Sequence, residues 1–541
     1  MITIASLIPF ISVISDPSLI VGNQYLNLIY NYFEFTNNNN FIVFLGLFFL
    51  SLVIFSNISY LLNIWVTNFF IFKIGAQISE NLFKYYLRDN IALDIENSSS
   101  KLSSKIVLEV HRFVDGVLFS YLTIIFKSFF LFFVFILLLI FNTKITLVGF
   151  SAIFIFYISI FLLVKKPVIK FGKKISDLQK LRLKLISEVF FGIKEVKIFN
   201  QVKYFQDKFK NFSSDLNKKI AFNRSVSASP RYLLELLALG GLCLLAIFSH
   251  ISSNGNLSEF IPIVSIYIFA GYKLLPSSQT IFSSLTTLSS ETSSFLNFKD
   301  DLLNLRMGDN LVNKSNSKKE ATFKKFIKFT DVCLQYENTN FEISNFNLEI
   351  LENDYVGIYG KSGSGKSSVI NILCGFIKQT SGKINIDNDL MSELNLKSWW
   401  AKISYVPQSV YIFDDTLKNN IVMRENLDSN LLNEVINFVG LDYLITTPNN
   451  YDILLGEKGS QISGGEAQRI GIARAIYKKS KILILDEFTS ALDEENENKI
   501  LEVLLKLKGK ITVVLVTHKK KVLEICNKKV LMNNGKIIKL L

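Results

Sequence analysis

The amino-acid sequence predicts an all-α bundle of transmembrane helices followed by an α/β domain. Hydrophobic residues make up 49% of the 541 residues and charged residues only 19%, which is more apolar than an ordinary soluble protein. The apolar runs lie in the first half of the chain, whereas short strand-like and helix-like patterns alternate in the second half. We therefore expect a membrane domain over 1–294, a polar linker over 295–322 and a soluble domain over 323–541.

Five apolar runs in the first half are each about 20 residues or longer, enough to cross the ~30 Å hydrocarbon core of a bilayer. They are Phe41–Val66, Val117–Phe141, Ile145–Val164, Tyr232–Ile251 and Phe260–Leu285. A sixth run, Ile2–Ile14, is too short to span by itself. We expect this first helix to be completed by another element or to begin upstream of Met1.

The distribution of charge predicts the orientation of the spans. Segments 67–116 and 165–231 are rich in Lys and Arg, whereas 16–40 and 252–259 contain neither. Because Lys and Arg favour the cytoplasmic side, the two long segments are expected in the cytoplasm. The helical periodicity of Leu185–Phe199 predicts that the membrane helices extend into them. The net charge of +13 is then explained by the Lys and Arg residues that set the membrane topology. A soluble nucleic-acid ATPase is excluded, because it would not contain five apolar runs long enough to span a membrane.

The segment GKSGSGKS, Gly360–Ser367, matches a phosphate-binding loop between a strand-like run and a helix-like run. Its glycines let backbone N–H groups surround phosphates, and the following helix start adds positive potential. Lys366 suits the β- and γ-phosphates, and the Ser367 hydroxyl suits Mg²⁺. The candidate nucleotide ligands of this loop are Gly360, Lys361, Ser362, Gly363, Ser364, Gly365, Lys366, Ser367 and Ser368.

Two further motifs in the second half suit phosphate chemistry. ILILDE, Ile482–Glu487, is an apolar strand that ends in two carboxylates: Asp486 suits Mg²⁺ and Glu487 suits general base catalysis. Without the loop, a strand end with two acidic caps would explain the pair equally well. In ISGGEAQR, the residues Ser463, Gly464 and Gly465 begin a helix and form a second candidate anion site.

These motifs, in this order over about 325–541, resemble the nucleotide-binding domain of ATP-binding-cassette (ABC) transporters. The resemblance implies ATP and Mg²⁺ as cofactors. It implies catalytic roles for Glu487, for His518 in VTH and for Gln408 in YVPQS, with Gln408 also near Mg²⁺. Tyr336 falls where the family stacks an aromatic ring on adenine, although an edge-strand tyrosine is the simpler alternative.

The resemblance also implies a dimer. In this family two cassettes pair head to tail, so that each ATP lies between one phosphate-binding loop and the partner's signature motif, and Asp493 ends the interface loop SALD. One membrane half with one cassette therefore needs a second half-transporter chain, most simply an identical one. The signature here reads Ile-Ser-Gly-Gly-Glu where the family usually has Leu-Ser-Gly-Gly-Gln. Glu466 is nearly isosteric with Gln and lies at a helix start, where a negative charge is favoured, so we expect an active site.

The order of the domains resembles the exporter branch of this family, whose fold has about six membrane helices per chain. The resemblance implies a location in a bacterial cytoplasmic (inner) membrane. Four stretches resemble bacterial lipid-linked oligosaccharide flippases, which move polyprenyl-pyrophosphate glycans outward. They are Ile8–Pro17, Asn142–Leu147, Ser227–Glu235 and Gly271–Ser277. The resemblance implies ATP-driven flipping of such a lipid-linked substrate, with a turn of each cytoplasmic segment docked on the cassettes.

Three cations suggest how such a substrate would be bound. Counted along their spans, Lys273 and Lys127 lie at a similar depth, roughly 22 Å from the outer surface, and Arg231 a little deeper. Together they could bind a pyrophosphate. Alternatively, each cation extends to the inner interface. An exporter of peptide, drug or another lipid would not need them, and a non-transporting regulator would not need Glu487 and His518.

Overall fold

The structure is a computed structural model that divides into two compact units, Met1–Met307 and Gly308–Leu541. It describes 19–88, 99–141, 143–252, 260–304, 319–335, 342–423, 427–445, 451–456, 459–489 and 493–541, with residues 6, 9–11, 13–14 and 17. The boundary between the units falls within the segment 295–322. Residues 305–318 of that segment lie outside the described part of the chain.

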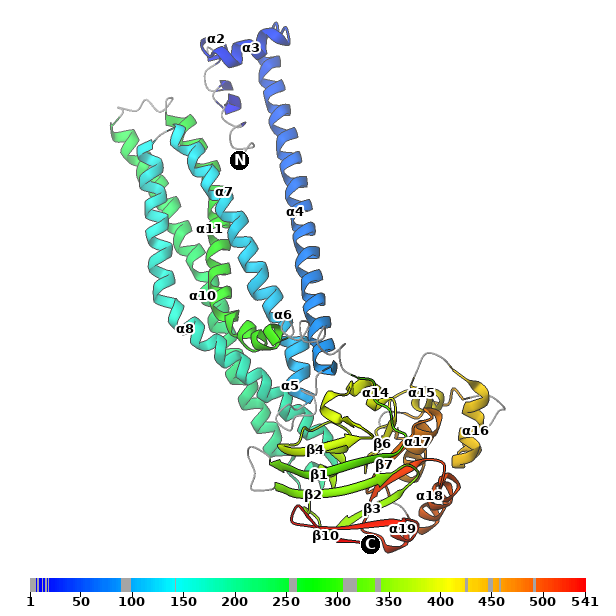
Figure 1. Ribbon diagram of the computed structural model, residues 1–541. Coiled ribbons are helices and arrows are strands. Elements are labelled where there is room, and N and C mark those ends of the chain that lie inside the picture. The colour runs from blue at the N-terminus through cyan, green and yellow to red at the C-terminus, as the bar shows by residue number, and fades with distance from the viewer. Residues whose placement is uncertain are drawn as a thin grey trace. The chain divides into compact units, whose positions relative to one another are not determined.

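Five long helices build the described part of the first unit, as can be followed in Figure 1. They are α4 (Asn38–Arg88), α7 (Phe119–Phe141), α8 (Thr143–Phe191), α10 (Val202–Ser252) and α11 (Phe260–Leu296). Each contains all or nearly all of one of the five predicted spans, and the described parts of the two basic segments are mostly helical. A 51-residue helix such as α4 is about 76 Å long, more than twice the hydrocarbon thickness of a bilayer. By length and hydropathy, three described stretches could cross a membrane: Asn38–Leu87, Lys101–Ile140 and Thr146–Phe191.

Short elements connect the long helices. They are α2 (Leu19–Gly22), α3 (Gln24–Tyr32), α5 (Ser99–Ser104), the π-helices η2 (Lys105–Glu109) and η3 (Phe113–Leu118) with α6 (Val110–Arg112) between them, and α9 (Ile193–Ile198). The described residues of the first apolar run pack against the start of α4, where Val13 joins Phe41 and Leu45 in a small core.

Helix α11 packs against α7, α8 and α10. Gly172 of α8 permits the closest approach, since a Cβ atom there would lie 2.1 Å from the carbonyl oxygen of Ser290. The helices α7 and α11 are antiparallel: Gly116, just before α7, faces Glu291, and at the other end Leu138 packs in one core with Ala270. The helices α10 and α11 are antiparallel too, because Asn223 meets Ser290 and Ser227 meets Thr286.

The described residues of the second unit form two sheets. The larger sheet has the strand order β10-β9-β3-β8-β7-β6, and the smaller has the order β2-β1-β4-β5. The strands are β1 (Phe326–Gln335), β2 (Glu342–Leu351), β3 (Tyr355–Gly360), β4 (Ser381–Ile386), β5 (Asp389–Leu390), β6 (Ile403–Val406), β7 (Ile482–Asp486), β8 (Thr512–Val516), β9 (Lys528–Asn533) and β10 (Lys536–Leu540). In the larger sheet every neighbouring pair is parallel except β9 and β10.

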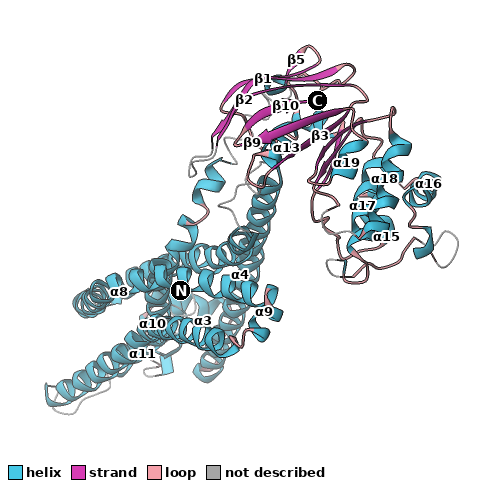
Figure 2. Ribbon diagram, turned by 90° about the horizontal axis from the view of Figure 1, so that it is seen from below, coloured by secondary structure: helices cyan, strands magenta, loops and turns pink. Residues whose placement is uncertain are grey.

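Helices cover the larger sheet, and Figure 2 shows α15, α16, α17 and α18 grouped on one side of its strands. The helices are α13 (Lys366–Leu373), η4 (Met391–Glu393), α14 (Leu396–Trp400), α15 (Leu417–Val422), α16 (Ser429–Val439), η5 (Asp442–Leu444), α17 (Gly464–Tyr477), α18 (Glu494–Leu507) and α19 (Lys520–Glu524). The apolar residues of β7 alternate between the two cores of this unit, which explains its unbroken Ile-Leu-Ile-Leu run.

Candidate functional site

The carboxyl ends of four parallel strands meet at one edge of the larger sheet. The phosphate-binding loop follows β3, Gln408 follows β6, Glu487 follows β7 and His518 follows β8. Because the strands β6, β7, β8 and β3 are adjacent and parallel, these residues gather at the same edge. This edge is the position at which open α/β sheets bind ligands.

The phosphate-binding loop has the backbone that its sequence requires. Gly360, Gly363 and Gly365 have φ angles of 154°, 78° and 99°, which only glycine adopts readily. A Cβ atom on Gly360 would lie 2.1 Å from the carbonyl oxygen of Met532. Gly365 caps the start of α13, so the N–H groups of this helix start are available to an anion.

Lys366 lies within the loop. Its Nζ donates hydrogen bonds to the carbonyl oxygens of Gly360 at 3.1 Å and of Lys361 at 3.0 Å. Burial lowers the pKa of Lys366, and the nearby carboxylates of Glu487 and Asp486 oppose that shift. The lysine is therefore held beside the two carboxylates that follow β7, in a position to bind an added phosphate.

Asp486 fits a magnesium ligand. Its side chain is buried, and its Oδ1 has no hydrogen-bond partner among the described residues. Burial and the neighbouring Glu487 raise the pKa of Asp486, while hydrogen bonds from Tyr405 and Ser367 oppose the shift. A buried carboxylate oxygen without a partner, next to a serine hydroxyl, is a donor set that Mg²⁺ prefers.

Glu487 is the centre of a contact between three of the predicted catalytic residues. Its Oε1 lies 3.0 Å from His518 Nε2, and its Oε2 accepts a hydrogen bond of 3.1 Å from Gln408 Nε2. Glu487 has a φ angle of 44°, a strained value for a residue with a side chain. Strain of this kind persists where surrounding contacts hold it, and the hydrogen bond from Glu487 N–H to Val516 is one such contact.

The signature residues form the start of α17. Ser463 caps the helix: its hydroxyl accepts from the Glu466 N–H at 3.3 Å, and the Glu466 carboxylate accepts from the Ser463 N–H at 2.5 Å. The Tyr443 hydroxyl also donates to Glu466, and Arg469 donates to Tyr443 at 3.0 Å. Burial raises the pKa of Glu466, but the hydrogen bonds from Tyr443 and Ser463 outweigh it and leave this pKa lowered. The acidic residue thus has two structural partners, which the sequence did not reveal.

Other predicted ligands lie away from these contacts or outside the described residues. Tyr336 is outside the described part of the chain, as are residues 490–492 before Asp493. Asp493 accepts a hydrogen bond of 2.6 Å from Asn496 at the start of α18. Gln468 was not predicted as a site residue from the sequence. Its Nε2 donates to the Gln408 carbonyl oxygen at 2.7 Å and so joins the signature helix to the segment after β6.

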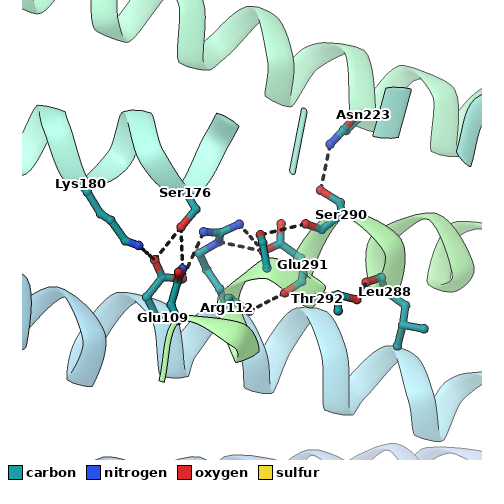
Figure 3. Close-up of polar contacts among 12 residues, drawn as sticks. Glu109, Arg112, Ser176, Lys180, Asn223, Leu288, Ser290, Glu291 and Thr292 are labelled. Atoms are coloured by element: carbon teal, nitrogen blue, oxygen red, sulfur yellow. Dashed lines mark hydrogen bonds and ion pairs between the residues drawn. The ribbon is translucent and has the colours of Figure 1, made fainter. Parts of the chain in front are cut away.

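The three membrane cations do not share one level along the bundle. The contacts between antiparallel helices, such as that of Asn223 with Ser290 in Figure 3, give their register, which can be extended residue by residue along each pair. In this register Lys127 of α7 is level with about residue 280 of α11, and Arg231 of α10 is level with about residue 282. Lys273 therefore lies seven to nine residues before these levels on α11, roughly 12 Å away along the helix axis. The sequence predicted a similar depth for Lys273 and Lys127 because each residue was counted from an assumed end of its span, whereas the register between helices comes from their contacts.

Each cation has a local partner. Lys127 Nζ donates to the Tyr60 hydroxyl at 3.2 Å and lies 4.8 Å from the centre of that ring. Arg231 pairs with Glu235 at 3.0 Å, one turn along α10, with 57% of its side chain exposed. Lys273 lies 5.9 Å from the ring centre of its neighbour Tyr272.

Comparison with known proteins agrees with this arrangement. A family model described as the ABC transporter transmembrane region matches residues 6–272, and one described as ABC transporter matches 343–490. An export ATP-binding/permease protein of Rickettsia typhi is 30% identical over 69% of this chain, which spans 66% of that relative's length. An ATP-dependent lipid A-core flippase of Saccharophagus degradans is 28% identical over 87% of this chain and 80% of that relative.

A solved structure has the same fold. A bacterial Atm1-family ABC exporter with ATP bound matches with a TM-score of 0.74 and 18% identity, covering 99% of this chain and 92% of that one. Together with the family models, it confirms the predicted fold class: a transmembrane helical domain followed by an α/β ATPase domain.

Proposed function

Because this chain belongs to the ABC transporter family, with a membrane domain fused to an ATPase domain, we propose that it is an ATP-driven exporter of a lipid-linked substrate. The observation that carries the proposal is the contact of Glu487 with both His518 and Gln408 at the edge of the sheet. A regulator without ATPase activity would not need these three side chains together.

The site residues have separate roles in ATP hydrolysis. The loop 360–368 binds the phosphates of ATP, and Ser367, Gln408 and Asp486 hold Mg²⁺, which neutralises charge on the phosphates when bound. Glu487 accepts a proton from the attacking water, and His518 orients the carboxylate of Glu487. Ser463 and Gly465 lie at a different helix start from the loop, which suits a phosphate contact to the ATP of a second chain.

We propose a dimer of two such chains, most simply identical, in a bacterial cytoplasmic membrane with the ATPase domains inside. The basic segments 67–116 and 165–231 favour that orientation. ATP closes the two ATPase domains on each other, and this closure switches the membrane domains from facing inward to facing outward.

The proposed substrate is a polyprenyl-pyrophosphate oligosaccharide. Its diphosphate would be bound by Arg231 and Lys127, which lie at similar levels, and Lys273, roughly 12 Å away along α11, would contact the substrate elsewhere on its path. The Saccharophagus relative is named a lipid A-core flippase, and the four stretches described above resemble flippases of lipid-linked oligosaccharides. An exporter of peptide or drug is the second candidate, favoured by the local partners that each cation already has.

Translocation in proteoliposomes tests the proposal. The purified protein is reconstituted with a fluorescent polyprenyl-pyrophosphate oligosaccharide, and outward movement is followed with and without ATP. We expect movement in the wild type, none in Glu487→Gln, and a several-fold slower rate in Lys273→Ala. Lys144→Ala, which removes an exposed cation at the start of α8, is the matched control.

Two outcomes would contradict the proposal. ATP hydrolysis without glycolipid movement in the wild type would discard this substrate and keep the ABC exporter. Equal transport by Lys273→Ala and Lys144→Ala would remove Lys273 from the substrate path.

A further inference from the structure

The segment after β6 carries a predicted catalytic side chain on an irregular backbone. Residues 407–415 are neither helix nor strand, and Gln408 is exposed. The side chain of Gln408 nevertheless donates to Glu487 at 3.1 Å. An irregular segment can adopt many conformations, so a site residue on it needs contacts from a rigid element that fix its backbone.

One side of α17 supplies such contacts. This helix packs against β6. Gly471 of α17 permits a close approach, since a Cβ atom there would lie 3.0 Å from the side chains of Val406 and Val410. Three residues further along the same side, Arg474 Nη1 donates to the carbonyl oxygen of Tyr411 at 2.9 Å. The helix therefore supports the irregular segment from the end of β6 onward.

Gln468 lies on this side of α17, three residues before Gly471, and holds Gln408 itself. Gln468 is only 5% exposed, and its Nε2 donates to the carbonyl oxygen of Gln408 at 2.7 Å. Because a carbonyl oxygen only accepts, the orientation of the Gln468 amide is fixed. The bond thus fixes the backbone of the residue whose side chain contacts Glu487.

The fold as a whole gains little from the buried amide of Gln468. Its Oε1 is buried and has no hydrogen-bond partner among the described residues. Burying an unpaired polar atom costs free energy, which offsets the stability that the single bond of the amide contributes. A buried polar residue that is only partly paired therefore points to a role in the site rather than in stability.

The contact joins two parts of the site. Gln468 lies five residues after Ser463, the cap of α17 in the signature motif. From Gln468 the contacts continue through Gln408 to Glu487 and His518. One buried side chain therefore connects the helix that begins at the signature with the carboxylate proposed to accept the proton in the same chain.

We infer that Gln468 is a positioning residue for ATP hydrolysis. It acts through Gln408 rather than on the substrate: its hydrogen bond fixes the Gln408 backbone so that the Gln408 side chain reaches Glu487. The inference rests on the proposed function, since it deepens the role of Gln408 in hydrolysis.

Steady-state ATPase measurements on the purified full-length protein test this inference with Gln468→Met. Methionine is unbranched and similar in size to glutamine but has no N–H donor. We expect kcat to fall about five- to tenfold, the effect of one lost hydrogen bond. KM for ATP should stay within about twofold, because the phosphate-binding loop is unchanged. Gln379→Met makes the same change between α13 and β4 of the same unit, and it should leave both constants as in the wild type.

A double-mutant cycle with Gln408 separates positioning from a general structural effect. Gln408→Met removes the side chain that Gln468 is inferred to position. Adding Gln468→Met to that variant should therefore lower kcat no further. A merely structural role of Gln468 would lower kcat by the same factor whether or not the Gln408 side chain is present.

Hydrogen exchange of the nucleotide-free protein gives a readout that does not depend on ATP. In Gln468→Met, peptides that cover residues 407–415 should exchange faster than in the wild type, whereas peptides of β7 and β8 should not. The melting temperature should stay within about 2 °C of the wild type, since the variant also removes an unpaired buried oxygen.

The outcomes separate the inference from the proposed function. An unchanged kcat in Gln408→Met would overturn the proposed role of Gln408, and this inference with it. A lower kcat in Gln408→Met together with an unchanged kcat in Gln468→Met would overturn the inference alone. Additive losses in the double variant, or faster exchange throughout the ATPase domain, would overturn it too, because both indicate a structural role.

Discussion

His518 Nε2 lies 3.0 Å from Glu487 Oε1, although 31 residues separate them in the chain. The two residues meet because β7 and β8 are adjacent and parallel and each residue follows its own strand. Glu487 has a strained backbone, and its side chain is held in one orientation because His518 and Gln408 each contact one oxygen of its carboxylate.

Replacing His518 by alanine should lower kcat for ATP about 10- to 100-fold with little change in KM. The variant keeps the phosphate-binding loop but releases the carboxylate that receives the proton. Steady-state ATPase measurements on the purified protein check this result. His518→Gln, which retains a hydrogen-bond donor, should recover part of the loss. An equal loss in both variants, or a loss confined to KM, would mean that orientation of Glu487 is not the role of His518.

Replacing Asp486 by asparagine should stabilise the metal-free protein while abolishing ATP hydrolysis. The pKa of Asp486 is raised chiefly by burial, so its ionised form is unfavourable in the folded state and stability is lost as pH rises through that raised pKa. At neutral pH with EDTA, we expect the variant to melt a few degrees higher, for a gain of about 1 kcal/mol.

Differential scanning calorimetry in EDTA, with Asp442→Asn as an exposed control, checks the effect of Asp486→Asn. Added Mg²⁺ and ATP should then stabilise the wild type and the control more than the variant. A lower melting temperature of Asp486→Asn in EDTA would show that this carboxylate contributes to folding rather than to metal binding.

Much of this site could be predicted from the sequence because local patterns determine it. Glycines with positive φ, an unbroken apolar strand and a helix start each involve a few neighbouring residues, and the order of parallel strands gathers them. The partners of Glu466 could not be predicted, since Tyr443 comes from a separate turn 23 residues away. In the membrane unit, the sequence predicted the five long helices but not the register between them, which depends on contacts such as Gly172 with Ser290.

Glu466→Gln should keep ATP hydrolysis within about threefold of the wild type, because glutamine also fits this capping position. It should lower the free energy of unfolding by roughly 0.5–1 kcal/mol, since Ser463 and Tyr443 donate to different carboxylate oxygens and glutamine has an oxygen at only one of the two positions. The pKa of Glu466 is lowered in the folded state, so its contribution is complete above the ordinary value of 4.5 and is lost as pH falls through the lowered pKa.

Chemical unfolding of the two proteins between pH 3 and pH 7 checks the effect of Glu466→Gln. The difference in free energy of unfolding between wild type and variant should be constant near neutrality and should shrink below about pH 4.5. Tyr443→Phe should destabilise the wild type more than it destabilises the glutamine variant. A difference that grows on acidification would refute the assignment of these hydrogen bonds.

Two glycines of α8 should respond in opposite ways to alanine. A Cβ atom at Gly172 would meet the backbone of Ser290 at 2.1 Å, so Gly172→Ala must separate α8 from α11. A Cβ atom at Gly149 has nothing within 4 Å among the described residues, so Gly149→Ala only adds helix propensity, about 0.5–1 kcal/mol. We expect Gly172→Ala to lower the melting temperature in detergent by several degrees and Gly149→Ala to raise or preserve it. Because both changes add one methyl group to the same helix, equal melting temperatures would show that the close packing of α8 on α11 does not stabilise the membrane unit.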